Sequence, residues 1–299
     1  MTYLFLVTFV WAFSFSLIAK YLAGTVDPFF SAFCRSFLAF LLFVPFLDLT
    51  FLSFMHALLL LSIGGVQLGL MYVFYYQSFL YLSVPEILVF TIFTPIYITL
   101  LYDLYHKKFS LQHMLSACLA VLGAALIRQT GISESFLQGF LCIQGANLCF
   151  AFGQVAYKVL LEKISSKKPQ RCFFAYFYLG ATLVTGLSFY MLADKSKLPS
   201  SFEHWLVLLW LGFVASGFGF FAWNKGASKV SSGQLAVMNN ALIPVGLIVN
   251  IFFTKSFHMS WSFVLGSALI FLALFVEKIS YLYLRLFSTA SGIDTPERK

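Results

Sequence analysis

Residues 55–80 read MHALLLLSIGGVQLGLMYVFYYQSFL, a long stretch without a single Asp, Glu, Lys or Arg. A transmembrane helix needs roughly 20 consecutive, mostly apolar residues, because the hydrocarbon core of a bilayer is about 30 Å thick. The apolar residues here are continuous rather than alternating, which excludes a strand of a membrane barrel. The stretch therefore predicts a membrane-spanning helix.

The composition extends this conclusion to the whole chain. Of its 299 residues, 61% are hydrophobic and 10% are charged, whereas a soluble domain carries about 25% charged residues. The net charge of +8 fits the excess of Lys and Arg on the cytoplasmic side of membrane proteins better than a nucleic-acid partner. The predicted partners are the lipid bilayer and a small-molecule substrate, with no nucleic acid.

Ten stretches have the length and apolarity of membrane spans. The first is read as a span and not as a signal peptide, because no basic segment precedes it and no cleavage site follows it. Residues 288–299 are polar and are predicted to form a disordered cytoplasmic tail. The predicted spans are 2–22, 28–46, 55–80, 84–104, 111–128, 136–158, 172–193, 204–222, 231–253 and 260–283.

The basic residues predict the orientation. With the N-terminus placed in the cytoplasm, most Lys and Arg residues fall in cytoplasmic loops, including Lys107, Lys108, Lys167 and Lys168. Because such a bias sets the topology of membrane proteins, we expect both termini to be cytoplasmic and the number of spans to be even.

The two halves of the chain resemble each other. Gly69 aligns with Gly217, Ser83 with Ser231, and the mid-span Pro95 with Pro244. Each half has five predicted spans, and an odd number inverts one repeat relative to the other. The predicted fold is all-α and integral to the membrane, with ten transmembrane helices in two inverted five-helix repeats, residues 2–130 and 136–283.

Paired prolines inside spans mark candidate interruptions of helices. Pro95 and Pro244 occupy corresponding places in the two halves, and transporters built from inverted repeats bind substrate near the midplane at such interruptions. The alternative is a tolerated kink in each helix.

Charges inside spans are candidates for function, because burying a charge in the membrane is costly. Arg35 lies inside the second span and Glu86 opens the fourth. Glu86 can bind a cationic substrate or carry a proton, or it can be an acid that stabilises a helix N-terminus. Arg35 can bind an anionic group, or it can pair with Glu86.

Amides and aromatic residues complete the candidate site. Asn239 and Asn240 precede Pro244, and Asn224 follows Trp223; such amides either contact substrate or hydrogen-bond between helices. The aromatic residues can stack on a planar or cationic ligand, or belong to the belt at the membrane interface. The candidate substrate-binding residues are Trp11, Arg35, Tyr75, Tyr76, Glu86, Tyr157, Trp223, Asn224, Asn239 and Asn240, with Pro95 and Pro244 as helix breaks.

No motif for catalysis or nucleotide binding occurs. The chain has no G-x-x-x-x-G-K-[ST], G-x-S-x-G or H-E-x-x-H sequence, and its five cysteines form no C-x-x-C, so we expect no metal, no cofactor and no enzymatic activity. Transport would then be driven by a gradient. A membrane-embedded enzyme is the rival class. The sequence indicates no oligomeric state.

Several of these residues carry a resemblance to a known family. Residues 11–16, WAFSFS, with Asp27-Pro28, Arg35 and Pro95, resemble the EamA-type members of the drug/metabolite transporter superfamily over nearly the whole chain. The resemblance implies a secondary transporter of small metabolites in the inner membrane of a bacterium.

Shorter strings resemble one branch of that superfamily. They are 21–24 (YLAG), 94–100 (TPIYITL), 214–217 (VASG) and 238–240 (MNN). The branch includes enterobacterial biotin carriers and the S-adenosylmethionine/S-adenosylhomocysteine transporters of obligate intracellular bacteria.

Three observations favour S-adenosylmethionine uptake as the expected activity, with exchange for S-adenosylhomocysteine as one form of it. The chain is rich in Phe, Ser and Cys, and Lys225 departs from the enterobacterial pattern. Glu86 with aromatic residues would suit a sulfonium cation, whereas biotin would leave Glu86 without a partner. Biotin uptake is the alternative, and export of amino acids or drugs is another.

Overall fold

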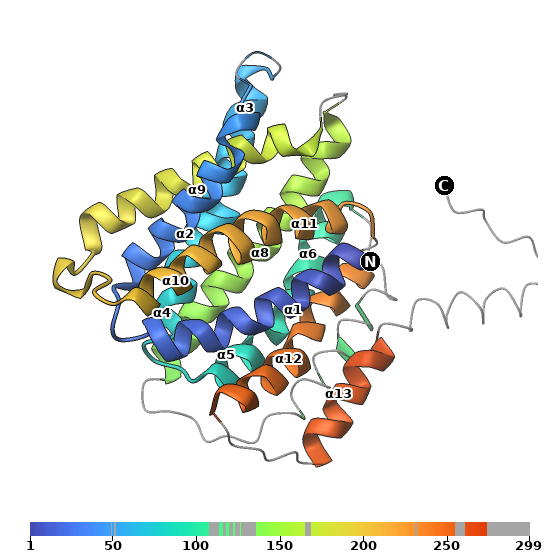
Figure 1. The fold of residues 1–299 in the computed structure, drawn as a ribbon. Coiled ribbons are helices and arrows are strands. Elements are labelled where there is room, and N and C mark those ends of the chain that lie inside the picture. Colours follow the sequence, from blue (N-terminus) through green and yellow to red (C-terminus); the bar gives the residue numbers. More distant parts are fainter. Residues whose placement is uncertain are drawn as a thin grey trace, which may run out of the picture.

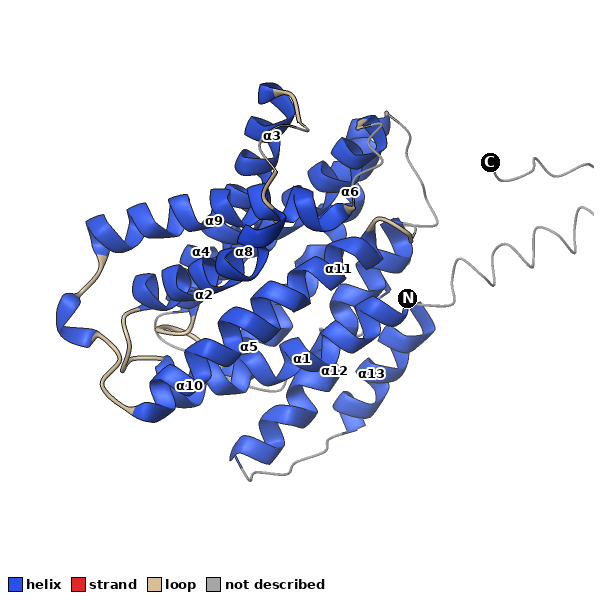
Figure 2. Ribbon diagram, turned by 45° about the horizontal axis from the view of Figure 1, so that its top comes forward, coloured by secondary structure: helices blue, strands red, loops and turns tan. Residues whose placement is uncertain are grey.

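The computed structural model describes residues 1–48, 50, 52–107, 136–164, 169–230, 232–254 and 261–273, with residues 114, 115, 118, 119, 122 and 126. In this part of the chain every regular element is a helix (Figure 2). The first half contains α1 (Thr2–Leu17), η1 (Ile18–Leu22), α2 (Pro28–Phe43), η2 (Val44–Phe46), α3 (Phe54–Gly64), η3 (Gly65–Leu70), α4 (Met71–Ser78), α5 (Val84–Phe90), η4 (Thr91–Phe93) and α6 (Thr94–His106). The second half contains α8 (Phe136–Lys163), α9 (Gln170–Leu192), η5 (Lys195–Lys197), α10 (Phe202–Trp210), η6 (Leu211–Phe218), α11 (Gly219–Ala227), α12 (Ser232–Thr254) and α13 (Trp261–Ala273).

Eight helical stretches of the described residues are long and apolar enough to cross a membrane. They correspond to eight of the ten predicted spans, and the predicted all-helical membrane fold is confirmed. The predicted span 111–128 lies almost wholly outside the described residues, and the span 260–283 is described only as α13. The predicted tail, 288–299, also lies outside them.

The contacts between helices follow a pattern of two equivalent halves. Helix α2 packs against α9; α1 packs against α12 as α8 packs against α6; and α2 contacts η6 as α9 contacts η3. In Figure 1, α1 lies beside α11 and α12, which come from the other end of the chain. Each of these contacts has a counterpart between the corresponding helices of the other half, as expected of two repeats.

A π-helical segment interrupts the third span of each half. These segments are η3 and η6, and they contain the aligned glycines Gly69 and Gly217. A π-helix disturbs the regular hydrogen-bond ladder and is frequent at functional sites. The pairing supports the internal repeat that the glycines indicated.

Two glycines let α3 and α9 approach each other closely. A Cβ atom on Gly64 would collide with the backbone carbonyl of Phe177, and one on Gly180 would collide with that of Leu61. Lipid gives no hydrophobic drive for helices to associate, so close van der Waals packing at small residues replaces it. This contact joins the two halves.

Asp27 fixes the start of α2 and holds a loop of the other half. Its Oδ1 accepts from the Phe30 amide at 2.8 Å, and its Oδ2 accepts from the Asp194 amide at 2.9 Å. Pro28 at the first helical position needs no amide partner. In that loop, two hydrogen bonds from Ser196 lower the pKa of the Asp194 carboxyl.

The two paired prolines differ in local structure. The fourth span changes to a 3₁₀ turn, η4, directly before Pro95, which stands at the start of α6. In contrast, α12 continues through Pro244 as one α-helix, so the interruption predicted there is not observed. A membrane helix tolerates proline where neighbouring groups satisfy the freed backbone.

Candidate functional site

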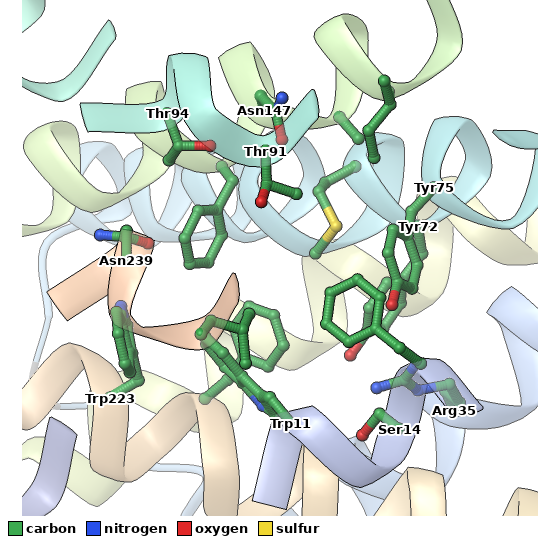
Figure 3. Close-up of a pocket in the computed structure, with 17 residues that line it drawn as sticks. Trp11, Ser14, Arg35, Tyr72, Tyr75, Thr91, Thr94, Asn147, Trp223 and Asn239 are labelled. Atoms are coloured by element: carbon green, nitrogen blue, oxygen red, sulfur yellow. The ribbon is translucent and has the colours of Figure 1, made fainter. Parts of the chain in front are cut away.

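A cavity lies between helices of both halves; the space between its lining atoms is about 680 Å³, which includes space open to solvent. Figure 3 shows its side chains converging from α1, α2, α4, α8, α11, α12 and the η4–α6 turn. The residues with polar groups among those that line it are Trp11, Ser14, Arg35, Tyr72, Tyr75, Thr91, Thr94, Asn147, Trp223 and Asn239.

Aromatic rings from three helices form one wall of this cavity. The centroid of the Trp11 ring lies 4.7 Å from that of Trp223, 4.7 Å from that of Phe220 and 5.8 Å from that of Phe150. Such a wall offers ring faces to a planar, apolar or cationic part of a ligand.

The π-helix η6 positions part of this wall. The Trp11 indole nitrogen donates to the Ala215 carbonyl at 2.9 Å, and the Tyr178 hydroxyl donates to the Ser216 and Gly217 carbonyls at 2.7 Å. A π-helix leaves carbonyl groups outside the regular ladder, where side chains can bind them. Because its N–H is engaged, Trp11 presents its ring and not a donor to the cavity.

Arg35 is a buried cation on the cavity wall. Its side chain is 2% exposed, and its Nε donates to the Ser216 hydroxyl at 2.9 Å. Its Nη1 donates to the Tyr76 hydroxyl at 3.4 Å, and its guanidinium carbon lies 4.3 Å from the centre of the Tyr72 ring. These contacts hold the guanidinium in place and leave N–H groups free.

Arg35 has no acidic partner in the described part of the chain, where its electrostatic neighbours are tyrosines. It is also the charged residue among those that line the cavity. An unpaired charge within a membrane protein is costly and marks a substrate or ion pathway. The cavity is thus suited to a ligand with an anionic group.

Glu86 does not line this cavity. Its Oε2 accepts from the Ser83 amide and from the Ser83 hydroxyl, both at 2.8 Å, in a capping box that begins α5. This is the helix-terminus alternative for Glu86. The sequence allows an ion pair between Glu86 and Arg35 as an alternative. This pair is not observed, since Arg35 contacts Ser216, Tyr72 and Tyr76 instead.

The other predicted residues divide into two groups. Trp11, Tyr75, Trp223 and Asn239 line the cavity with Arg35. Tyr76 lies behind Arg35; Asn224 bonds Gln67 at 3.2 Å and the Phe220 carbonyl at 3.1 Å; and Tyr157 packs on Phe174 and Phe177. Asn240 is buried, and neither its amide nitrogen nor its amide oxygen has a hydrogen-bond partner among the described residues. Their role in binding stays a prediction.

Five polar residues that line the cavity were not among the candidates; they are Ser14, Tyr72, Thr91, Thr94 and Asn147. Tyr72 stacks on Arg35 and bonds Ser216 at 2.6 Å. Asn147 lines the cavity from α8. Ile143, Ala146, Asn147 and Phe150 share one helical face by their spacing and all line the cavity; that spacing is the signal that could have identified Asn147.

Comparisons with known proteins agree with a transporter. The model of the EamA-like transporter family matches residues 1–129 and again residues 137–277. A "Probable biotin transporter" of Pseudomonas aeruginosa is 43% identical over 279 residues, which are 93% of this chain and 98% of that protein. A "Biotin transporter" of Salmonella typhimurium is 42% identical, and one of Escherichia coli K12 is 41% identical; each match covers 93% of both chains.

A solved structure described only as "Crystal structure of protein" shares the fold. Its TM-score is 0.70 at 16% identity, and the match covers 93% of this chain and 97% of that one. The two family matches together span most of the chain, and the predicted membership of this superfamily is confirmed. This chain, with eight described helical stretches that could cross a membrane, belongs to the EamA-like transporter family.

Proposed function

We propose that this protein carries biotin across the bacterial inner membrane as a secondary transporter. The observation that supports this most directly is Arg35, a buried cation that lines the cavity without a carboxylate partner in the described chain. Biotin carries one carboxylate, which a guanidinium binds with two parallel hydrogen bonds. Relatives more than 40% identical are described as biotin transporters.

The rest of the cavity is compatible with the body of the same molecule. Biotin is an aliphatic acid ending in a small bicyclic ring with a urea edge. The apolar side chains of Phe15, Met71 and Leu242 would cover the aliphatic chain, and the amides of Asn147 and Asn239 would meet the polar edge. Binding sites of this kind combine apolar walls with a few polar groups.

The preference for S-adenosylmethionine rested on the composition of the chain, on Lys225 and on the Glu86 carboxylate as a partner for the sulfonium. That carboxylate is engaged in the capping box with Ser83, so it is not placed to neutralise a sulfonium in this cavity. Without it the cavity carries a positive charge, which favours an anion. The ranking of the two substrates is therefore reversed, and biotin comes first.

S-adenosylmethionine remains the second candidate because of one observation. Trp11, Phe220 and Trp223 form a wall of neighbouring aromatic rings, and such walls bind sulfonium or quaternary cations through the ring faces. The carboxylate of S-adenosylmethionine would then bind Arg35.

Uptake into cells distinguishes the two substrates. Cells that lack their own biotin carrier and express this protein should take up radiolabelled biotin saturably, and unlabelled biotin should compete. Arg35→Ala should lower uptake at least about tenfold, and Arg35→Lys should restore it only partly, because lysine lacks the planar fork. Uptake of labelled S-adenosylmethionine that biotin does not inhibit would contradict the proposal.

We propose further that both termini are cytoplasmic and that residues 2–130 and 136–283 are the two halves that rock about the cavity, with 288–299 as a cytoplasmic tail. Reporter fusions at the two ends should both report the cytoplasm, and deletion of 288–299 should leave uptake unchanged. Counterflow in proteoliposomes separates import, export and exchange, since only an exchanger needs internal substrate.

A further inference from the structure

We infer that Asn147, Asn239 and Trp223 form a subsite for a cyclic urea, in which the two amide oxygens accept hydrogen bonds from the urea N–H groups and the indole N–H donates to the urea oxygen. The inference rests on the proposed function, in which Arg35 binds the carboxylate of the same substrate. It adds that the end of the substrate away from the carboxylate is also bound by polar contacts, and it states which group donates and which accepts in each hydrogen bond.

The orientation of the Asn147 amide is set by a backbone carbonyl. Its Nδ2 donates to the carbonyl of Phe90 at 2.8 Å, where α5 gives way to η4. A carbonyl can only accept, so the nitrogen must face it and the amide oxygen must face the other way. Figure 3 shows the Asn147 oxygen on the cavity side, and no hydrogen bond to it is found within the described residues.

Asn239 is oriented in the same manner from the opposite helix. Its Nδ2 donates to the Leu235 carbonyl, one turn earlier in α12, at 2.8 Å. The oxygen is again the group left for the cavity, as Figure 3 shows. Two amides from different helices of the cavity wall, α8 and α12, therefore present acceptors, and a ligand that meets both needs two donors.

Trp223 supplies the complementary donor. Its side chain is 1% exposed, and its Nε1 has no hydrogen-bond partner in the described part of the chain. In Figure 3 the nitrogen-bearing end of the ring points toward Asn239. A buried N–H without an acceptor is destabilising, which a ligand oxygen would relieve.

The neighbouring Trp11 shows that this is not a general property of the wall. The two indole rings lie with their centroids 4.7 Å apart and their planes tilted by 33°, yet the Trp11 N–H is satisfied by the Ala215 carbonyl at 2.9 Å. Both rings can pack on a ligand, but only Trp223 of this pair retains a donor.

Trp223 and Asn239 lie across the cavity from Arg35. Figure 3 places Trp223 and Asn239 at one side, Arg35 with Tyr72 at the other and Asn147 between these two groups in the view, and the apolar lining includes Phe15 and Met71. A molecule with a carboxylate at one end, a urea at the other and an aliphatic link matches this order of groups.

Competition binding with altered biotins tests the subsite in the full-length protein, purified in detergent with labelled biotin as the probe. Desthiobiotin keeps the urea and should compete within a few-fold of biotin. An analogue methylated on one urea nitrogen loses a donor, and one with a thiocarbonyl loses a good acceptor; each should bind about tenfold more weakly or worse.

Variants connect each loss to its residue. Trp223→Phe removes the N–H and should abolish the preference for the carbonyl over the thiocarbonyl, whereas Trp11→Phe should retain it. Asn239→Leu should abolish the penalty for N-methylation, whereas Asn250→Leu, on the same helix α12 but outside the cavity lining, should retain it. Where a variant does not purify as a single species, the analogue series measured on the unaltered protein tests the subsite instead.

The outcomes separate the two proposals. Equal binding of biotin and its N-methyl analogue would overturn the urea subsite and leave biotin transport standing. Loss of the carbonyl preference in Trp11→Phe as well as Trp223→Phe would also overturn it. Failure of both biotin and desthiobiotin to bind would overturn both proposals, and competition by adenosine instead would assign the subsite to a purine edge.

Discussion

The Nε atom of Arg35 donates a hydrogen bond to the hydroxyl of Ser216 at 2.9 Å. Arg35 belongs to α2 of the first half, and Ser216 belongs to the π-helix η6 of the second. Ser216 also bonds the Tyr72 hydroxyl at 2.6 Å, so one small side chain positions both the cation and the ring that stacks on it. The proposed anion site therefore depends on contact between the halves.

Replacing Ser216 by Ala should weaken substrate binding by about tenfold, because a hydrogen bond to a charged group contributes about 1.5–3 kcal/mol. KM for biotin uptake should rise, while the amount of protein in the membrane stays the same. Ser188→Ala is the matched control, since that hydroxyl only bonds its own helix at Val184. An unchanged KM in Ser216→Ala would show that Arg35 needs no such support.

Gly64→Ala and Gly180→Ala should each destabilise the protein. Either Cβ atom would collide with a backbone carbonyl of the facing helix, and forced overpacking costs about 1–3 kcal/mol. Thermal unfolding in detergent should show lower midpoints for both. Gly186→Ala, also on α9, would bring Cβ only to 3.4 Å from the Phe33 ring and should change the midpoint little; a similar loss there would argue against the close-approach explanation.

Asp27→Asn and Asp27→Ala should weaken the cap of α2 to different degrees. Asn keeps one acceptor, for either the Phe30 or the Asp194 amide, whereas Ala keeps neither. Losing a cap costs about 0.5–2 kcal/mol. Limited proteolysis of the loop at 193–201 should become faster in the order unaltered protein, Asn, Ala. Equal rates in all three would mean that this carboxylate does not hold the loop.

Glu86→Gln should leave biotin uptake and its dependence on pH unchanged. The carboxylate serves the capping box with Ser83, and a glutamine oxygen can accept the same two hydrogen bonds. Glu86→Leu, which removes the cap, should lower the thermal midpoint without changing substrate preference. A Glu86→Gln protein that is abundant but inactive would return the carboxylate to the transport mechanism.

The places of the eight spans in the described part of the chain were accessible from local composition. The stretch 55–80 reads as a span wherever it lies in the fold, because about 20 apolar residues are needed simply to cross the lipid. Aligned glycines, Gly69 and Gly217, indicated the repeat, and both lie in π-helices. Arg35 was identified for the same local reason, since a charge within such a stretch is exceptional.

Which side chains meet in the cavity was not accessible in that way. Glu86, like Arg35, is a charged residue within a predicted span, yet its carboxylate binds the nearby Ser83. The identity of each partner depends on distant segments: Arg35 meets Ser216, and Asn147 meets the Phe90 carbonyl.

The sequence by itself determined a multi-span helical membrane protein with a repeated half and a buried arginine, since those are properties of segments. The tertiary structure alone decided that Asn239 faces the cavity while the adjacent Asn240 does not. Successive residues of a helix point about 100° apart, and a membrane helix that is apolar on all sides has no amphipathic pattern to show which direction faces inward. Only the packing of the other helices around α12 makes that choice.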